Sequence, residues 1–134
     1  MNSNLSLRLV LFFHLFIILT IRGADAVDIH VPEDFDTIQA AVTAATDGDT
    51  IILANGFYTG TGNDDIHLNG KEIAIISANG PENCTISSCR QEAAFICDGT
   101  ETRNTIISGI CFRDFTTVTQ GAICILGDAS PTIS

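Results

Sequence analysis

The chain has 134 residues, with 16 acidic and 6 basic side chains, and its formal net charge is −10. This length suits one domain, because a domain commonly holds about 100–200 residues. The acidity argues against nucleic acid and anionic membrane surfaces as partners, since both attract clustered Lys and Arg side chains, and the sequence has no basic cluster.

The first segment of the chain is typical of a signal peptide. Arg8 is the only charged residue among the first 21, and residues 9–19 are apolar apart from one histidine. A signal peptide needs about 7–15 apolar residues, whereas a membrane span needs about 20. An Ala-Asp-Ala cleavage sequence follows at residues 24–26. We therefore expect residues 1–26 to be removed, with an uncleaved anchor as the alternative. Residues 27–134 would then be secreted without a membrane span, or periplasmic or on the cell surface in a bacterium.

A single helix is predicted next, over about residues 36–46. The spacing of Asp36 and Gln39 predicts a capping box, in which the Asp36 carboxylate accepts the Gln39 backbone N–H and the Gln39 side chain reaches back. Gly48 is well placed to end the helix in a left-handed conformation. A helix this short is marginal alone in water, so its apolar stripe should cover another apolar surface. The stripe follows helical spacing and comprises Ile38, Ala41, Val42 and Ala45.

Short strands are predicted on both sides of this helix. Residues 29–31 form an extended run that Pro32 stops. From residue 50 onward, helical periodicity is absent, and eight short runs rich in Ile and Thr are separated by turn sequences such as Asn-Gly and Asp-Gly. These runs are residues 50–54, 66–68, 73–77, 84–87, 93–97, 105–112, 122–125 and 131–134.

Two β architectures compete for these strands. Asn-Gly between apolar runs is a hairpin signal, which favours an antiparallel sandwich or barrel. A two-residue loop at Asn69 and Gly70, however, would pair Leu68 with Lys71, and a charged side chain would then lie opposite an apolar one on the face that should be buried. A solenoid of parallel strands instead places asparagines at corners, isoleucines inside and a helix over the first coil. We therefore expect an all-β parallel solenoid with an N-terminal capping helix and coils from about residue 50.

Several stretches of the sequence resemble the right-handed parallel β-helix proteins of the pectin-lyase-like superfamily. Residues 31–42 and 47–58 resemble their Pro-containing lead-in, capping helix, Gly-Asp-Thr strand entry and Gly-x-Tyr turn. Residues 70–86 are similar to a second-coil sequence, and residues 130–134 to the start of a Ser-Pro-Thr-Ile repeat. The resemblance covers residues 29–134 and implies a right-handed parallel β-helix. Because the chain stops within a repeat sequence, we expect the N-terminal part of a longer or truncated β-helix domain.

All five cysteines lie after the signal segment, and in an exported chain they can form disulfides whose pairing the sequence leaves open. An odd number leaves one cysteine free or paired outside the chain, and buried reduced thiols are the alternative. Neither His30 nor His67 has zinc-ligand spacing from a cysteine pair. Asn83 begins an Asn-Cys-Thr glycosylation sequence. The cysteines are Cys84, Cys89, Cys97, Cys111 and Cys124.

The resemblance implies three enzyme chemistries to look for: calcium-dependent lyases with an Arg or Lys base, hydrolases with paired aspartates, and esterases with an aspartate nucleophile. Asp64 and Asp65 form the only adjacent acidic pair after the signal segment and are weak candidates for calcium or sugar binding. A solvated loop is the preferred interpretation. Arg113 and Asp114 would point to opposite faces of a strand, which favours two unrelated surface charges. No catalytic residue and no cofactor is therefore assigned, and calcium enters only for a lyase.

Two functions remain open. The favoured one is a secreted, non-catalytic β-helix repeat protein that serves as a surface or matrix module or contacts a polysaccharide or cell-surface glycan. The alternative is the N-terminal part of a pectate-lyase-like enzyme that acts on polyuronates. The first is favoured because no catalytic set carries over from the resemblance and because the acidic chain would repel a polyuronate. The ligand and the oligomeric state stay undecided.

Overall fold

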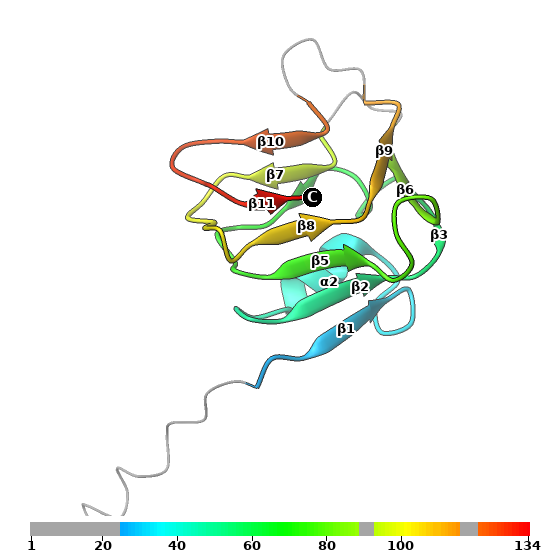
Figure 1. The fold of residues 1–134 in the computed structure, drawn as a ribbon, viewed down its shortest axis with the longest axis horizontal. Coiled ribbons are helices and arrows are strands. Elements are labelled where there is room, and N and C mark those ends of the chain that lie inside the picture. The colour runs from blue at the N-terminus through cyan, green and yellow to red at the C-terminus, as the bar shows by residue number, and fades with distance from the viewer. Residues whose placement is uncertain (1–24, 89–92, 116–120) are drawn as a thin grey trace, which may run out of the picture.

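The computed structural model describes residues 25–88, 93–115 and 121–134, which form a parallel β-solenoid of about four turns with one short helix (Figure 1). The predicted signal peptide therefore lies, except for its last two residues, outside the described residues. Every pairing between described strands is parallel. The sequence-based expectation of a parallel solenoid over an antiparallel sandwich is confirmed.

The strands belong to three parallel sheets that run along the solenoid. The five-stranded sheet contains β1 (Asp28–Val31), β2 (Thr50–Leu53), β5 (Ala74–Ser77), β8 (Ile106–Ser108) and β11 (Thr132–Ile133). The β3 sheet contains β3 (Gly56–Thr59), β6 (Cys84–Ser87) and β9 (Cys111–Arg113). The β4 sheet contains β4 (Ile66–His67), β7 (Phe95–Cys97) and β10 (Ile123–Ile125).

Two strand predictions need correction. Residues 105–112, expected as one strand, hold β8 and the start of β9, because Gly109 with φ of 67° turns the chain into a different sheet. The β3 strand was expected to be a turn. It is held in place by Tyr58, whose buried hydroxyl donates to the carbonyl oxygens of Val31 (3.1 Å) and Ala54 (2.9 Å).

Like side chains stack on one another between successive coils. In the five-stranded sheet, one register row holds an isoleucine on every strand. Burying each such side chain contributes roughly 1.5–3 kcal/mol, so this row is a main source of stability. The row consists of Ile29, Ile51, Ile75, Ile107 and Ile133, of which the first four are buried.

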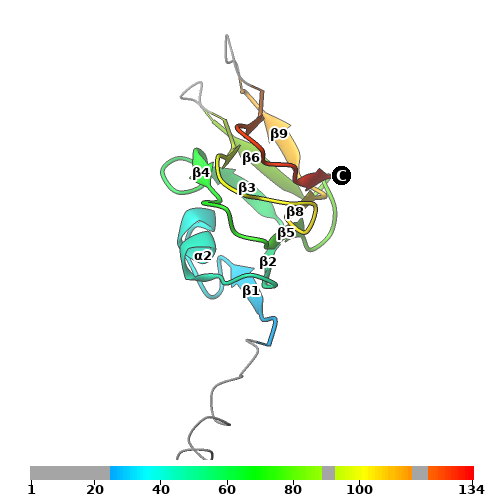
Figure 2. The same ribbon diagram turned by 90° about the vertical axis from the view of Figure 1, so that its left-hand side faces the viewer.

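The helix α2 (Ile38–Ala44) lies beside β1 near the N-terminal end of the solenoid (Figure 2). All four residues of the predicted apolar stripe are buried, so the helix covers the core there as expected. Within the described residues, no helix has the length and apolar character to span a membrane.

The predicted ends of this helix are wrong. Its N-cap is Thr37, whose Oγ1 accepts from the Ala40 backbone N–H at 3.3 Å, and the Asp36–Gln39 capping box does not form. The helix ends at Ala44, well before Gly48. Gly48 does adopt φ of 94°, but its N–H donates to the Glu72 carbonyl oxygen at 2.8 Å and so ties the turn to the next coil.

The C-terminal end of α2 is stabilised by a distant cation instead. Lys71 Nζ donates to the carbonyl oxygens of Val42 (2.6 Å), Thr43 (2.9 Å) and Ala45 (2.7 Å). These carbonyl groups have no partner within the helix, and a cation there also opposes the negative end of the helix dipole. Lys71 thereby fixes the helix to the following coil.

Candidate functional site

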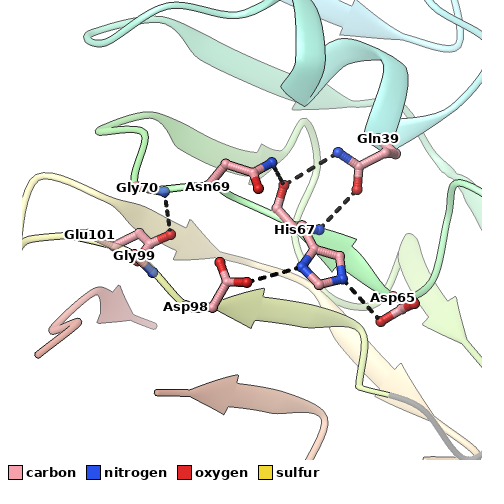
Figure 3. Close-up of polar contacts among 8 residues, drawn as sticks. All are labelled: Gln39, Asp65, His67, Asn69, Gly70, Asp98, Gly99 and Glu101. Atoms are coloured by element: carbon pink, nitrogen blue, oxygen red, sulfur yellow. Dashed lines mark hydrogen bonds and ion pairs between the residues drawn. The ribbon is translucent and has the colours of Figure 1, made fainter. Parts of the chain in front are cut away.

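A group of polar side chains on the described surface, the His67 cluster, consists of Asp65, His67 and Asp98 (Figure 3). His67 Nδ1 lies 3.2 Å from Asp98 Oδ2, and His67 Nε2 lies 3.6 Å from Asp65 Oδ1. The three side chains are 42%, 44% and 35% exposed in the order His67, Asp65, Asp98. The cluster is therefore open to a ligand from solution.

The solenoid register brings these three residues together. Asp65 immediately precedes β4, and its φ of 55° is a left-handed conformation that Asp tolerates better than most residues. His67 is in register with Ile96 of β7, and Asp98 lies two residues further along the neighbouring coil. Because side chains alternate along a strand, Ile96 and Asp98 share the outer side of the sheet with His67.

The backbone of His67 is held from both sides by side chains. Gln39 of α2 accepts from the His67 backbone N–H through Oε1 (2.9 Å) and donates from Nε2 to the His67 carbonyl oxygen (3.3 Å). Asn69 Nδ2 donates to the same carbonyl oxygen at 3.1 Å. Gln39 thus takes the place of a further strand at the free edge of β4, and Figure 3 shows the amide facing this backbone. The imidazole therefore projects from a fixed position.

A buried carboxylate fixes the adjoining corners. Glu101 is 1% exposed and accepts the backbone N–H groups of Gly70 (2.7 Å) and Gly99 (2.9 Å) through its two oxygens (Figure 3). The two glycines pack against each other, and a Cβ atom on Gly99 would lie 2.7 Å from the Gly70 nitrogen. The Asn-Gly sequence at residues 69–70 is therefore a packed solenoid corner.

Among the described residues, the contacts of the His67 cluster leave hydrogen-bonding capacity on its two carboxylates. A carboxylate accepts several hydrogen bonds, and a neutral imidazole donates through one nitrogen only. Asp65 and Asp98 contact different nitrogens of the imidazole ring. The described residues contain no group of three or more His, Cys, Asp or Glu side chains arranged to hold a metal ion.

The structure separates the predicted acidic pair. Asp65 joins the His67 cluster, whereas Asp64 is only 5% exposed and accepts from the Ser88 hydroxyl at 2.9 Å. The expectation of a solvated loop therefore suits Asp65 but is wrong for Asp64. Shared calcium binding by these two neighbours has no support in this arrangement, because their side chains serve different partners.

The basic residues are dispersed. Arg113 is exposed at the end of β9, and the adjacent Asp114 accepts from the Ser87 hydroxyl at 2.9 Å. Arg103 is also exposed, whereas Lys71 is engaged by α2. Arg90 lies outside the described residues. Within the part of the chain that the structure describes, no ion pair joins Arg113 to Asp114.

The four described cysteines, Cys84, Cys97, Cys111 and Cys124, are free thiols, and Cys89 lies outside the described residues. Cys111 is in register with Thr85, so it is offset by one residue from Cys84 on the neighbouring strand. Cys124 is in register with Ile96, so it is likewise offset by one residue from Cys97. Burial, reinforced by the nearby Cys111, raises the pKa of Cys84 to about 11. Burial, reinforced by Glu101 and other neighbours, raises the pKa of Cys97 to about 11. Both thiols therefore stay protonated and poorly nucleophilic at neutral pH.

Sequence reasoning missed most of the residues that build this site. The sequence places His67 without zinc-ligand spacing and Asp98 in a turn sequence, and neither pattern predicts that the two side chains meet. The available signal was the position of Asp98-Gly99 directly after a strand, one coil beyond His67. The roles of Gln39 and Glu101 depend on contacts between coils, and local sequence patterns do not predict such contacts.

Comparisons of this chain with protein-family models, with curated proteins and with solved structures give no match.

Proposed function

We propose that this chain is a secreted, non-catalytic β-solenoid module that contacts neutral glycans through the His67 cluster. The observation that carries the proposal is the exposed set of one imidazole and two carboxylates on two successive coils, held on an immobilised backbone. Carboxylates are strong acceptors for the hydroxyl groups of sugars. A preorganised site also loses little conformational entropy when it binds.

Charge favours a neutral glycan over an acidic one. The chain carries a net −10, and the His67 cluster presents two carboxylates to solution. Lys71, a basic residue close to the cluster in the sequence, is already engaged by three carbonyl oxygens. A polyuronate would therefore meet repulsion at this surface, and Lys71 is not available to offset it.

The same proposal includes export of the chain and its relation to a known group of β-helix proteins. The segment of residues 1–26 supports secretion, or a periplasmic or cell-surface location in a bacterium. The parallel solenoid with a short helix near its N-terminal end supports kinship with the right-handed β-helix proteins of the pectin-lyase-like superfamily. Because one fold hosts many activities, this kinship does not itself choose between a binding module and an enzyme.

The test is native affinity electrophoresis of the full chain in gels that contain a β-1,4-glucan, a mannan, a xylan or polygalacturonate. We expect a neutral polysaccharide to retard the chain and polygalacturonate to leave it unaffected. The double variant Asp65→Asn with Asp98→Asn should weaken this retardation by about tenfold, which corresponds to roughly 1.4 kcal/mol. The matched control, Asp36→Asn with Asp128→Asn, makes the same change in charge at exposed positions and should bind as the parent does.

Three results would overturn the proposal. Equal binding by the two double variants would show that the His67 cluster does not take part in binding. If none of the neutral polysaccharides retards the chain, neutral glycans are excluded as its ligands. Calcium-dependent release of unsaturated products from polygalacturonate would favour the alternative, a pectate-lyase-like enzyme.

A further inference from the structure

The glycosylation sequence at Asn83 lies at an exposed corner of the solenoid. Asn83 is exposed, its backbone N–H donates to the Gly80 carbonyl oxygen (3.1 Å), and its own carbonyl oxygen accepts from the Gly56 N–H (2.9 Å). Cys84, the next residue, is buried, and Thr85 is half-buried on β6. Because side chains alternate on either side of Cys84, the Asn83 amide and the Thr85 hydroxyl lie on the same outer side of the chain.

An exposed aromatic ring lies close to this corner. Phe57 of β3 is 61% exposed, the highest value among the large apolar side chains of the described residues. Phe57 is in register with Thr85 on the neighbouring strand, and Gly56 is in register with Cys84. Asn83 therefore lies on the coil next to Phe57, two residues before the position that is directly opposite Phe57. With strands about 4.8 Å apart and a rise of about 3.3 Å per residue, this offset is roughly 8 Å. That distance suits a sugar linked to Asn83 that packs on the Phe57 ring.

We propose that Asn83 carries an N-linked glycan when the chain passes through a eukaryotic secretory pathway, and that its first sugar covers Phe57. In the reaction, the Asn83 amide nitrogen attacks C1 of a polyisoprenyl-diphosphate-linked oligosaccharide. The N–C1 bond forms, the C1–O bond to the diphosphate breaks, and one amide proton leaves to a base. Asn83 Nδ2 now donates to the Asn79 carbonyl oxygen at 3.0 Å. The glycosylated amide keeps one N–H group, so this hydrogen bond can persist.

This inference rests on the proposed export of the chain and not on its proposed contact with a glycan ligand. Asn83 begins the only Asn-x-Ser/Thr sequence in residues 27–134, so a single modified position is expected there. The sugar at Asn83 would belong to the protein itself and would lie on the β3 sheet, whereas the His67 cluster lies on the β4 sheet. A failure of one proposal therefore leaves the other intact.

The experiment expresses the full chain in a eukaryotic secretory host and measures glycan occupancy on both cell-associated and secreted protein by mass spectrometry. Peptide N-glycosidase should remove one glycan and convert Asn83 to aspartate. Asn83→Gln and Thr85→Ala should each abolish the glycan, and Thr85→Ser should retain it. An unmodified Asn83 in both fractions would overturn the proposal, and so would a glycan that survives Thr85→Ala.

The contact with Phe57 has its own readout. Phe57→Ala should lower the thermal midpoint of the glycosylated chain by about 4 °C more than that of the Asn83→Gln chain, because only the former loses the contact between ring and sugar. The matched control is Ile125→Ala, which removes an exposed apolar side chain from β10 and should have the same effect in both backgrounds. Equal effects of Phe57→Ala in the two backgrounds would overturn this contact.

Discussion

At the N-terminal end of the solenoid, side chains occupy the free edges of β1 and β4, whereas at the opposite end apolar side chains remain half exposed. Asp34 accepts the His30 backbone N–H through Oδ2 (2.7 Å) and donates its own backbone N–H to the His30 carbonyl oxygen (2.8 Å). Gln39 does the same for His67 with its side-chain amide. Each residue takes the place of a neighbouring strand, which prevents another strand from pairing there.

The opposite end of the described solenoid differs in burial. Ile133 belongs to the same register row as Ile51, yet it is 45% exposed whereas Ile51 is fully buried. Ile125 and Leu126, at the end of the β4 sheet, are 48% and 47% exposed. The comparison shows that an identical side chain in the same row is buried only where a neighbouring element covers it, and it is burial that stabilises the fold.

The largest difference between the ends should come from burying a charge. Val42→Asp places a carboxylate beneath α2 at a position with no exposure, and it should lower the free energy of unfolding by roughly 3–5 kcal/mol. Ile133→Asp makes the same chemical change at the half-exposed end and should cost less than about 1 kcal/mol. Urea unfolding followed by circular dichroism measures both. Equal losses would contradict the role of α2 as a cover for the core.

A smaller loss is expected where Lys71 joins α2 to the next coil. Lys71→Met keeps the apolar stem but removes three hydrogen bonds to helix carbonyl oxygens, so it should cost roughly 2–3 kcal/mol. Arg103→Met removes an exposed charge of the same sign and should change the free energy of unfolding by less than about 0.5 kcal/mol. The same urea experiment compares them. If Lys71→Met unfolds at the parent's midpoint, the carbonyl groups of α2 find adequate partners in water.

The smallest effect should follow from the edge contact of Gln39. Gln39→Leu leaves the His67 backbone N–H without its partner and should cost about 1–2 kcal/mol. Amide hydrogen exchange at His67 should accelerate by about fivefold to thirtyfold, the equivalent of that free energy. Gln39→Glu keeps the acceptor for this N–H and should give a smaller acceleration. An unchanged exchange rate in Gln39→Leu would show that the free edge of β4 is protected without Gln39.

The repeating part of this fold follows from the pattern of apolar residues along the chain. Short Ile-rich runs with turn sequences between them predicted a parallel solenoid, because stacked coils turn one side of each short run toward a shared apolar interior. The helical spacing of Ile38, Ala41, Val42 and Ala45 likewise predicted which side of α2 is buried. These features depend on the periodicity of apolar residues, which a single sequence displays directly.

The polar contacts, in contrast, depend on how the coils stack in three dimensions. Gln39 has the spacing of a capping residue, yet its amide pairs with the His67 backbone 28 positions away. Lys71 stabilises a helix that ends well before it in the chain. Asp98 contacts His67 from the neighbouring coil. Local spacing ranks only partners within a few residues. Which of the many distant polar groups becomes the partner is settled only when the register of the coils brings the two together.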